Sequence, residues 1–195
     1  MYDTELIRKM SGIVDYLWIV PSTLDLRQNV SAREDDFTFI DLSKNFRNSR
    51  EIVEMVKSYA EENNYDYKKG IVTPLENFPT GCKPKYVGSI EDAMKEARKQ
   101  TKDGILVIFN YDFDIFNQIK EKCKVYGEDR NDFKENENPY KFLQEGNVVA
   151  IHGLTCLGFE WATVIVFEGK GLTSTYHPCN FMMRCTTNLI VVKEK

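Results

Sequence analysis

The sequence predicts an α/β fold, built on a mostly parallel sheet with helices on both faces. Short apolar runs rich in β-branched residues recur without polar alternation, as in strands that are buried on both faces. Amphipathic helical patterns separate these runs, and parallel strands need crossover connections of that kind. The four clearest runs are residues 104–110, 148–151, 164–167 and 189–192.

The first part of the chain contains less regular patterns. Its expected elements are a short amphipathic helix over 1–12, buried strands over 16–20 and 37–40, a helix over 52–63 and a loop over 65–84. Asn48 and Glu51 have capping-box spacing, which predicts the start of the longer helix there. Arg47 would then open that helix.

The rest of the chain continues the alternation of strands and helices. Its further expected elements are a strand over 85–88, a helix over 89–97, a helix over 112–122, a short helix over 179–185 and the runs given above. Ser89 is in place to cap the first of these helices. Residues 126–146 are charged and aperiodic, which predicts an exposed loop.

Composition bounds the class of protein. A length of 195 residues fits one large or two small domains, and a net charge of −4 argues against a strongly basic surface that coats nucleic acid. The five cysteines are scattered without a C-x-x-C, which favours free thiols over a zinc or other metal site. Neither a membrane-length apolar run nor a signal-peptide pattern is visible, so we expect an intracellular protein, cytoplasmic or nuclear, with no membrane partner.

Three segments between these elements carry a recognisable pattern. Residues 42–52 read LSKNFRNSREI, residues 147–168 read NVVAIHGLTCLGFEWATVIVFE, and residues 183–192 read MRCTTNLIVV. In this order they resemble motifs IV, V and VI of UvrD/Rep-type superfamily 1 helicases. The family patterns are L-x-x-N-[YF]-R, T-I-H followed by G-L-E-[FW], and T-R-A before an apolar strand. The resemblance implies a RecA-like, P-loop NTPase-like fold, namely the second motor domain of such a protein.

The same resemblance implies a division of the chain into two parts. Residues 1–34 would be a remnant of the preceding motor domain, and residues 35–195 the RecA-like C-terminal domain, which lacks a P-loop of its own. Within the remnant, residues 25–28 give the D-x-x-Q of motif III, although several residues late and without its glycine. The L-W-I over residues 17–19 also resembles the vertebrate schlafen proteins.

The resemblance also assigns chemistry to particular side chains. Arg47 and Arg184 match the two arginines that stabilise charge on the γ-phosphate during transfer. A guanidinium suits this role because it stays charged and offers a planar fork of donors. Gly158 and Glu160 match the motif V turn, whose carboxylate can accept hydrogen bonds from ribose hydroxyls, and Gln28 is the third position expected on the nucleotide. These two arginines are expected at the carboxyl ends of the strands, close enough to share one anion.

Contacts to nucleic acid are implied less securely. His152 matches the histidine of T-I-H, which faces nucleic acid in the family. Three departures weaken this match, because Ala150, Leu157 and Met183 replace the family's Thr, Lys and Thr. The spacer between His152 and Gly158 is also two residues longer than usual.

Each of these residues also has an ordinary structural role open to it. Arg47 could be a solvated surface residue, and Glu160 could only cap its turn. Arg184, expected within the 179–185 helix, could lie at a partly buried surface. A lone histidine at a strand end, such as His152, is commonly structural.

The sequence contains no G-x-x-x-x-G-K-[ST]. ATP with Mg²⁺ is therefore expected only together with a missing N-terminal motor domain, the implied partner, and nucleic acid is expected to bind weakly. The resulting hypothesis is the C-terminal half of an ATP-dependent DNA or RNA helicase or translocase, inactive alone. A catalytically inactive helicase-like interaction domain is the alternative, and a nucleotide-binding α/β enzyme of another kind is a weaker third.

Overall fold

The computed structural model divides into two compact units, Met1–Ser43 and Lys44–Lys195. It describes residues 9, 45–63, 73–109, 117–119, 122–127, 130–153, 155–156, 158–168 and 178–193. Apart from Lys9, the predicted elements over 1–12, 16–20 and 37–40 lie outside the described residues. Gln28 and the proposed domain boundary at residue 34 lie outside them too.

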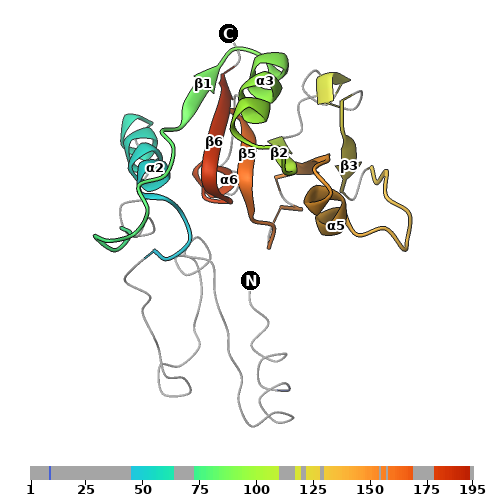
Figure 1. Cartoon of the computed structure of the whole chain (residues 1–195), viewed down its shortest axis with the longest axis horizontal. Coiled ribbons are helices and arrows are strands. Elements are labelled where there is room, and N and C mark those ends of the chain that lie inside the picture. The colour runs from blue at the N-terminus through green and yellow to red at the C-terminus, as the bar shows by residue number, and fades with distance from the viewer. Residues whose placement is uncertain are drawn as a thin grey trace. The chain divides into compact units, whose positions relative to one another are not determined.

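The described part of the second unit is organised around one parallel sheet (Figure 1). Its six strands are β1 (Lys85–Val87), β2 (Ile105–Phe109), β3 (Lys124–Tyr126), β4 (Val148–His152), β5 (Trp161–Glu168) and β6 (Cys185–Lys193). The spatial order is β1-β6-β5-β2-β4-β3, and every pairing is parallel. The predicted α/β, RecA-like fold class is thereby confirmed.

Both faces of the central strands are buried, as the unbroken apolar runs predicted. Alternate residues enter two separate clusters because successive side chains point to opposite faces of a strand. In β2, Leu106 and Ile108 join the larger cluster, whereas Ile105, Val107 and Phe109 join the smaller one. Every residue of β2 is therefore in the core.

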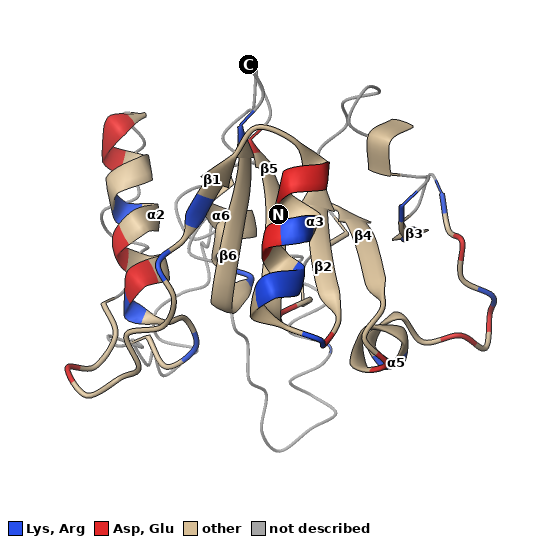
Figure 2. Ribbon diagram, turned by 45° about the horizontal axis from the view of Figure 1, so that its top comes forward, with Lys and Arg blue, Asp and Glu red and all other residues tan. Residues whose placement is uncertain are grey.

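Helices cover the two faces of the sheet. The described helices are α2 (Arg50–Glu62), α3 (Ile90–Gln100), α5 (Pro139–Gln144) and α6 (Pro178–Met182). Buried residues of α2, α5 and α6 enter the larger cluster, and those of α3 enter the smaller one. In α3, Glu91 and Asp92 lie in the first turn and Arg98 and Lys99 in the last, which complements the helix dipole (Figure 2).

Helix starts were predicted with mixed success. Ser89 caps α3 as expected, because its side chain accepts a hydrogen bond from the amide of Asp92 at 3.1 Å. The capping box predicted at Asn48 is wrong, since Ser49 is the residue before α2 and makes no side-chain cap. The Asn48 side chain instead donates hydrogen bonds to the carbonyls of Met183 and Cys185, which lie 135 and 137 residues further along the chain.

Two further boundaries differ from the sequence prediction. Residues 126–146 do not form only an exposed loop, because α5 lies within them and Phe133 and Leu143 are buried. A six-residue helix is too short to display a period, but the Asn138-Pro139 start signal was visible. The last helix ends at Met182 rather than 185, and β6 begins at Cys185 rather than 189.

Two simpler predictions concern the whole class of protein. None of the five cysteines, all of which the structure describes, forms a disulfide. Among the described helices, none combines the length and apolar character needed to cross a bilayer.

Candidate functional site

Arg184 and Glu160 lie side by side because each immediately precedes a strand. Glu160 precedes β5 and Arg184 precedes β6, and the first residues of these neighbouring strands, Trp161 and Cys185, are partners in register. The Trp161 amide donates to the Arg184 carbonyl at 3.1 Å. Both residues therefore lie at the edge where the strands begin, here called the amino edge.

The expected position at the carboxyl ends of the strands is therefore wrong. The general rule places ligands at that edge because loops leave the strands there. In a parallel sheet, however, a residue that precedes a strand lies at the opposite edge. Arg184 and Glu160 both precede strands. Arg184 is also not inside a helix, since it lies in the turn between α6 and β6.

The Asn48 side chain joins the segment that contains Arg47 to the two residues on either side of Arg184 in the sequence. Its side-chain amide donates to the carbonyls of Met183, at 2.8 Å, and Cys185, at 2.7 Å. Asn48 is fully buried; its hydrogen bond to Cys185 is shielded from water, and the one to Met183 partly so. The Ser49 amide adds a hydrogen bond to the Thr186 carbonyl at 3.1 Å.

Asn45 completes this arrangement within the Arg47 segment. Its side-chain oxygen accepts from the amides of Arg47, at 2.8 Å, and Asn48, at 2.9 Å. Its side-chain nitrogen donates to the Asn48 side-chain oxygen at 2.9 Å. The two asparagines therefore fix the backbone of Arg47 relative to that of Arg184.

The Arg47 side chain reaches the turn that precedes β5. Its Nη1 atom lies 2.5 Å from Oε1 of Glu160. The two side chains keep 45% and 35% of their exposure, so the pair lies at the surface. Arg47 itself lies in the loop before α2, three residues ahead of the helix it was expected to open.

The Arg184 side chain contacts the same crossover turn, defined as residues 153–160 between β4 and β5. Burial raises the pKa of the Cys156 thiol to about 11, and the Arg184 guanidinium beside it lowers the pKa in part. Arg184 is half-buried. Its Nε atom is buried and has no hydrogen-bond partner among the described residues.

The crossover turn needs glycine at two places. Gly158 has a φ of +90°, which side-chain-bearing residues rarely adopt. At Gly153, a Cβ atom would lie 2.3 Å from the Phe181 ring, so its absence lets α6 pack directly under the turn. The motif resemblance had pointed to Gly158. Its positive φ explains why a glycine is favoured at this position.

His152 is not brought together with the arginines. It is the last residue of β4 and pairs in register with Phe109, the last residue of β2. It therefore lies at the carboxyl edge of the sheet, where only 5% of it is exposed. Its ring packs edge-on against Phe109, with centroids 5.9 Å apart.

Sequence reasoning missed three residues that build this region. Asn45 and Asn48 were seen only as parts of a motif and of a cap, and Tyr140 lay in a supposed loop. The Tyr140 hydroxyl contacts the crossover turn at Gly158 and Glu160. The pair of asparagines three residues apart, on either side of Arg47, was the one available signal. The carbonyls to which Asn48 donates are too distant in sequence to be foreseen.

Comparisons with known proteins add little to this geometry. No protein-family model matches the chain, and no curated protein matches it. Among solved structures, it is similar to the C-terminal domain of a possible DNA helicase from Lactobacillus plantarum WCFS1. The identity is 12% and the TM-score 0.45, over 77% of this chain and 88% of that one. The fold assignment rests on the sheet topology given above.

Proposed function

We propose that this chain is the C-terminal half of a superfamily 1 ATP-dependent helicase or translocase. It would supply Arg47 and Arg184 to an ATP site that a preceding motor domain completes. One observation carries the proposal: three segments far apart in sequence, each resembling a helicase motif, meet at one place. Asn48 joins the first to the third, and Glu160 joins the second to the first.

The two arginines suit the charge that develops during phosphoryl transfer. Catalysis of this reaction is mainly positioning and electrostatic stabilisation, which guanidinium groups provide. Arg47 uses one of its nitrogens on Glu160, so the carboxylate holds the side chain in one orientation while other donors stay available. The buried Arg184 Nε supplies a second unused donor among the described residues.

An exposed aromatic ring lies next to these groups in sequence. Phe46 directly precedes Arg47 and keeps 65% of its exposure, the most of any large apolar residue that the structure describes. A ring left in solvent beside a phosphate-binding side chain can stack on the base of a nucleotide. Phe46 thus fits the proposal as a base contact.

One feature of the sequence favours the alternative of a catalytically inactive interaction domain. The chain has no phosphate loop, so neither Mg²⁺ nor the attacking water has residues here to position it. Both hypotheses therefore predict that the purified chain hydrolyses ATP only at background rate, with or without nucleic acid. They differ in whether the arginines of this half-site bind the phosphates of the nucleotide weakly on their own; full Mg-ATP binding would still need the preceding motor domain.

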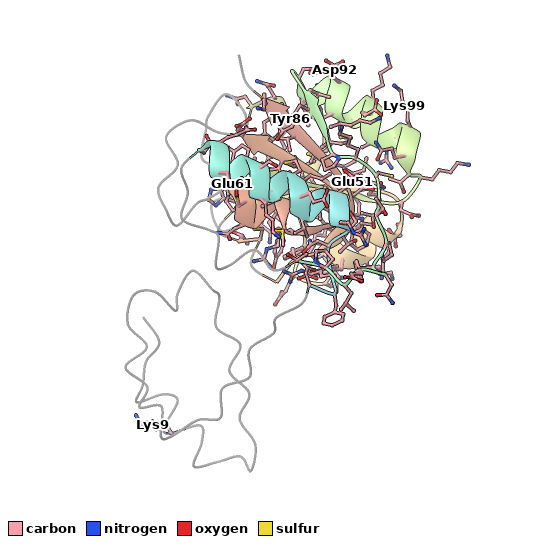
Figure 3. The ribbon with its side chains drawn as sticks, turned by 90° about the vertical axis from the view of Figure 1, so that its left-hand side faces the viewer. Lys9, Glu51, Glu61, Tyr86, Asp92 and Lys99 are labelled. Atoms are coloured by element: carbon pink, nitrogen blue, oxygen red, sulfur yellow. The ribbon has the colours of Figure 1, made fainter. Side chains whose placement is uncertain are left out.

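Titration of the chain with Mg-ATP separates the two hypotheses. Removal of a charge-assisted hydrogen bond costs about 1.5–3 kcal/mol, so Arg47→Ala and Arg184→Ala should each weaken affinity about 10- to 150-fold. Lys99→Ala is the matched control, because it removes one positive charge from α3, on the other face of the sheet (Figure 3). Circular dichroism checks that each variant is folded.

Equal affinities in wild type, both arginine variants and the control would reject the nucleotide site. Robust ATP turnover by the purified chain, lost in Arg184→Ala, would show instead that the chain is a complete enzyme.

A further inference from the structure

Tyr140 contacts four consecutive residues of the crossover turn and the start of β5. Its hydroxyl donates to the Gly158 carbonyl at 3.0 Å and accepts from the Glu160 amide at 3.3 Å. Its ring stacks on Phe159, with centroids 4.7 Å apart and planes 10° from parallel. The centroids of the Tyr140 and Trp161 rings lie 6.1 Å apart.

The helix that carries Tyr140 is itself firmly held. The Asn138 side chain caps α5 by accepting from the amides of Tyr140 and Lys141, and Pro139 occupies its first turn. Leu143 is fully buried, and its backbone packs closely against Gly104. Tyr140 therefore projects from a fixed platform.

The described residues of the turn are held both by its own backbone hydrogen bonds and by this platform. Gly158 is exposed, and an added Cβ atom there would meet nothing within 4 Å. The amide of Phe159 is bonded to the Cys156 carbonyl at 2.9 Å. The amide of Glu160, the residue that holds Arg47, is instead bonded to the Tyr140 hydroxyl.

We propose that Tyr140 is a positioning residue, which holds Glu160 where it can orient Arg47. The proposal extends the proposed function, because it makes segment 138–146 a determinant of nucleotide affinity although it belongs to none of the three motif-like segments. The hydroxyl is the decisive group, since within the described part of the chain it is the group that bonds to both Gly158 and Glu160.

Tyr140→Phe is the variant that tests this role, because it keeps the stacked ring and removes only the hydroxyl. Loss of a hydrogen bond of ordinary strength should speed hydrogen exchange at the Glu160 amide about 2- to 13-fold. The Arg47 side-chain NMR signal should shift toward that of a freely solvated guanidinium. Affinity for Mg-ATP should fall by a comparable factor.

Tyr86→Phe is the matched control. Tyr86 is another partly exposed tyrosine, on edge strand β1, and its hydroxyl contacts Met55 rather than the turn (Figure 3). It should leave all three measurements unchanged. In a Glu160→Ala background, Tyr140→Phe should alter Mg-ATP affinity less than about twofold, because its effect passes through Glu160.

The outcomes separate this proposal from the proposed function. If Tyr140→Phe gives the same result as Tyr86→Phe in both NMR measurements, the positioning role is overturned, whatever the Mg-ATP affinity of the variants. If the NMR signals move but neither Tyr140→Phe nor Arg47→Ala alters Mg-ATP affinity, the positioning role holds and the nucleotide site is rejected. If Arg47→Ala loses affinity and Tyr140→Phe leaves the NMR signals in place, the nucleotide site holds and positioning fails.

Discussion

At the amino edge of the sheet, the segment of Arg47 and Asn48 is joined to two segments more than a hundred residues further along the chain by side-chain hydrogen bonds and an ion pair. At the carboxyl edge, the described residues make a different kind of surface. There His152 is buried against Phe109, and an added side chain at Gly88 would meet open space. The amino edge carries long-range side-chain hydrogen bonds, whereas the described carboxyl edge has the buried His152–Phe109 contact and a surface ion pair between Lys193 and Glu168, 3.7 Å apart.

The difference bears on the nucleotide site proposed at the amino edge. Long-range polar contacts fix backbone segments relative to one another, which is what a preorganised binding site needs. Asn48 supplies such contacts at the amino edge, and Asn45 supports it through local hydrogen bonds to the Asn48 side chain and the Arg47 amide. The comparison leads to four predictions, which follow from the largest expected effect to the smallest.

Asn48→Ala should have the largest effect on stability. It leaves the carbonyls of Met183 and Cys185 without their donor, and each unsatisfied buried group costs about 1–3 kcal/mol. Urea unfolding should therefore show a loss of about 2–4 kcal/mol. Asn63→Ala is the control, because Asn63 is exposed and only donates to a carbonyl at the end of α2; it should lose less than about 1 kcal/mol. Equal losses would mean that Asn48 does not join the segments.

Two glycine substitutions compare the edges directly. Gly104 precedes β2 at the amino edge, where a Cβ atom would lie 2.1 Å from the Leu143 carbonyl oxygen. Gly104→Ala should cost about 1–3 kcal/mol, because backbone atoms must move. Gly88 follows β1 at the carboxyl edge, and Gly88→Ala should be neutral or stabilise by up to about 1 kcal/mol. A reversed order in thermal or urea unfolding would contradict the contrast.

Glu160→Gln should hardly change stability. Its pair with Arg47 is surface-exposed, and such pairs contribute about 0–1 kcal/mol. The variant should nevertheless weaken Mg-ATP binding, because the carboxylate orients Arg47. A loss of more than about 2 kcal/mol in unfolding free energy would show that the pair is structural rather than part of a ligand site.

Nucleic acid should bind weakly and without help from His152. The chain is acidic and Leu157 replaces the motif V lysine, so phosphate attraction is reduced. Fluorescence anisotropy with a labelled oligonucleotide should give a Kd on the order of 10⁻⁴ M or poorer at physiological salt. His152→Ala should leave this value unchanged, because the side chain is buried. Tight, salt-resistant binding that disappears in His152→Ala would favour a nucleic-acid-binding module.

The sequence predicted the fold better than the arrangement of the site. Apolar runs such as those in β2 and β4 identify buried strands because strand burial is a local property. The meeting of Arg47 with Glu160 depends on the order of strands β5 and β6, which no local pattern encodes. The edge was predicted wrongly for a related reason: the general rule was applied, although Arg184 visibly precedes its strand. Tyr140 was missed because α5 is short.

The most direct test of the central claim is to map Mg-ATP binding by backbone amide NMR. We expect the largest shifts at the amino edge, at Arg47, Glu160 and Arg184, and their loss in Arg47→Ala. Amides of Gly88 and His152, at the carboxyl edge, should stay in place. Shifts centred on the carboxyl edge, or a pattern unchanged by Arg47→Ala, would contradict a nucleotide site at the amino edge.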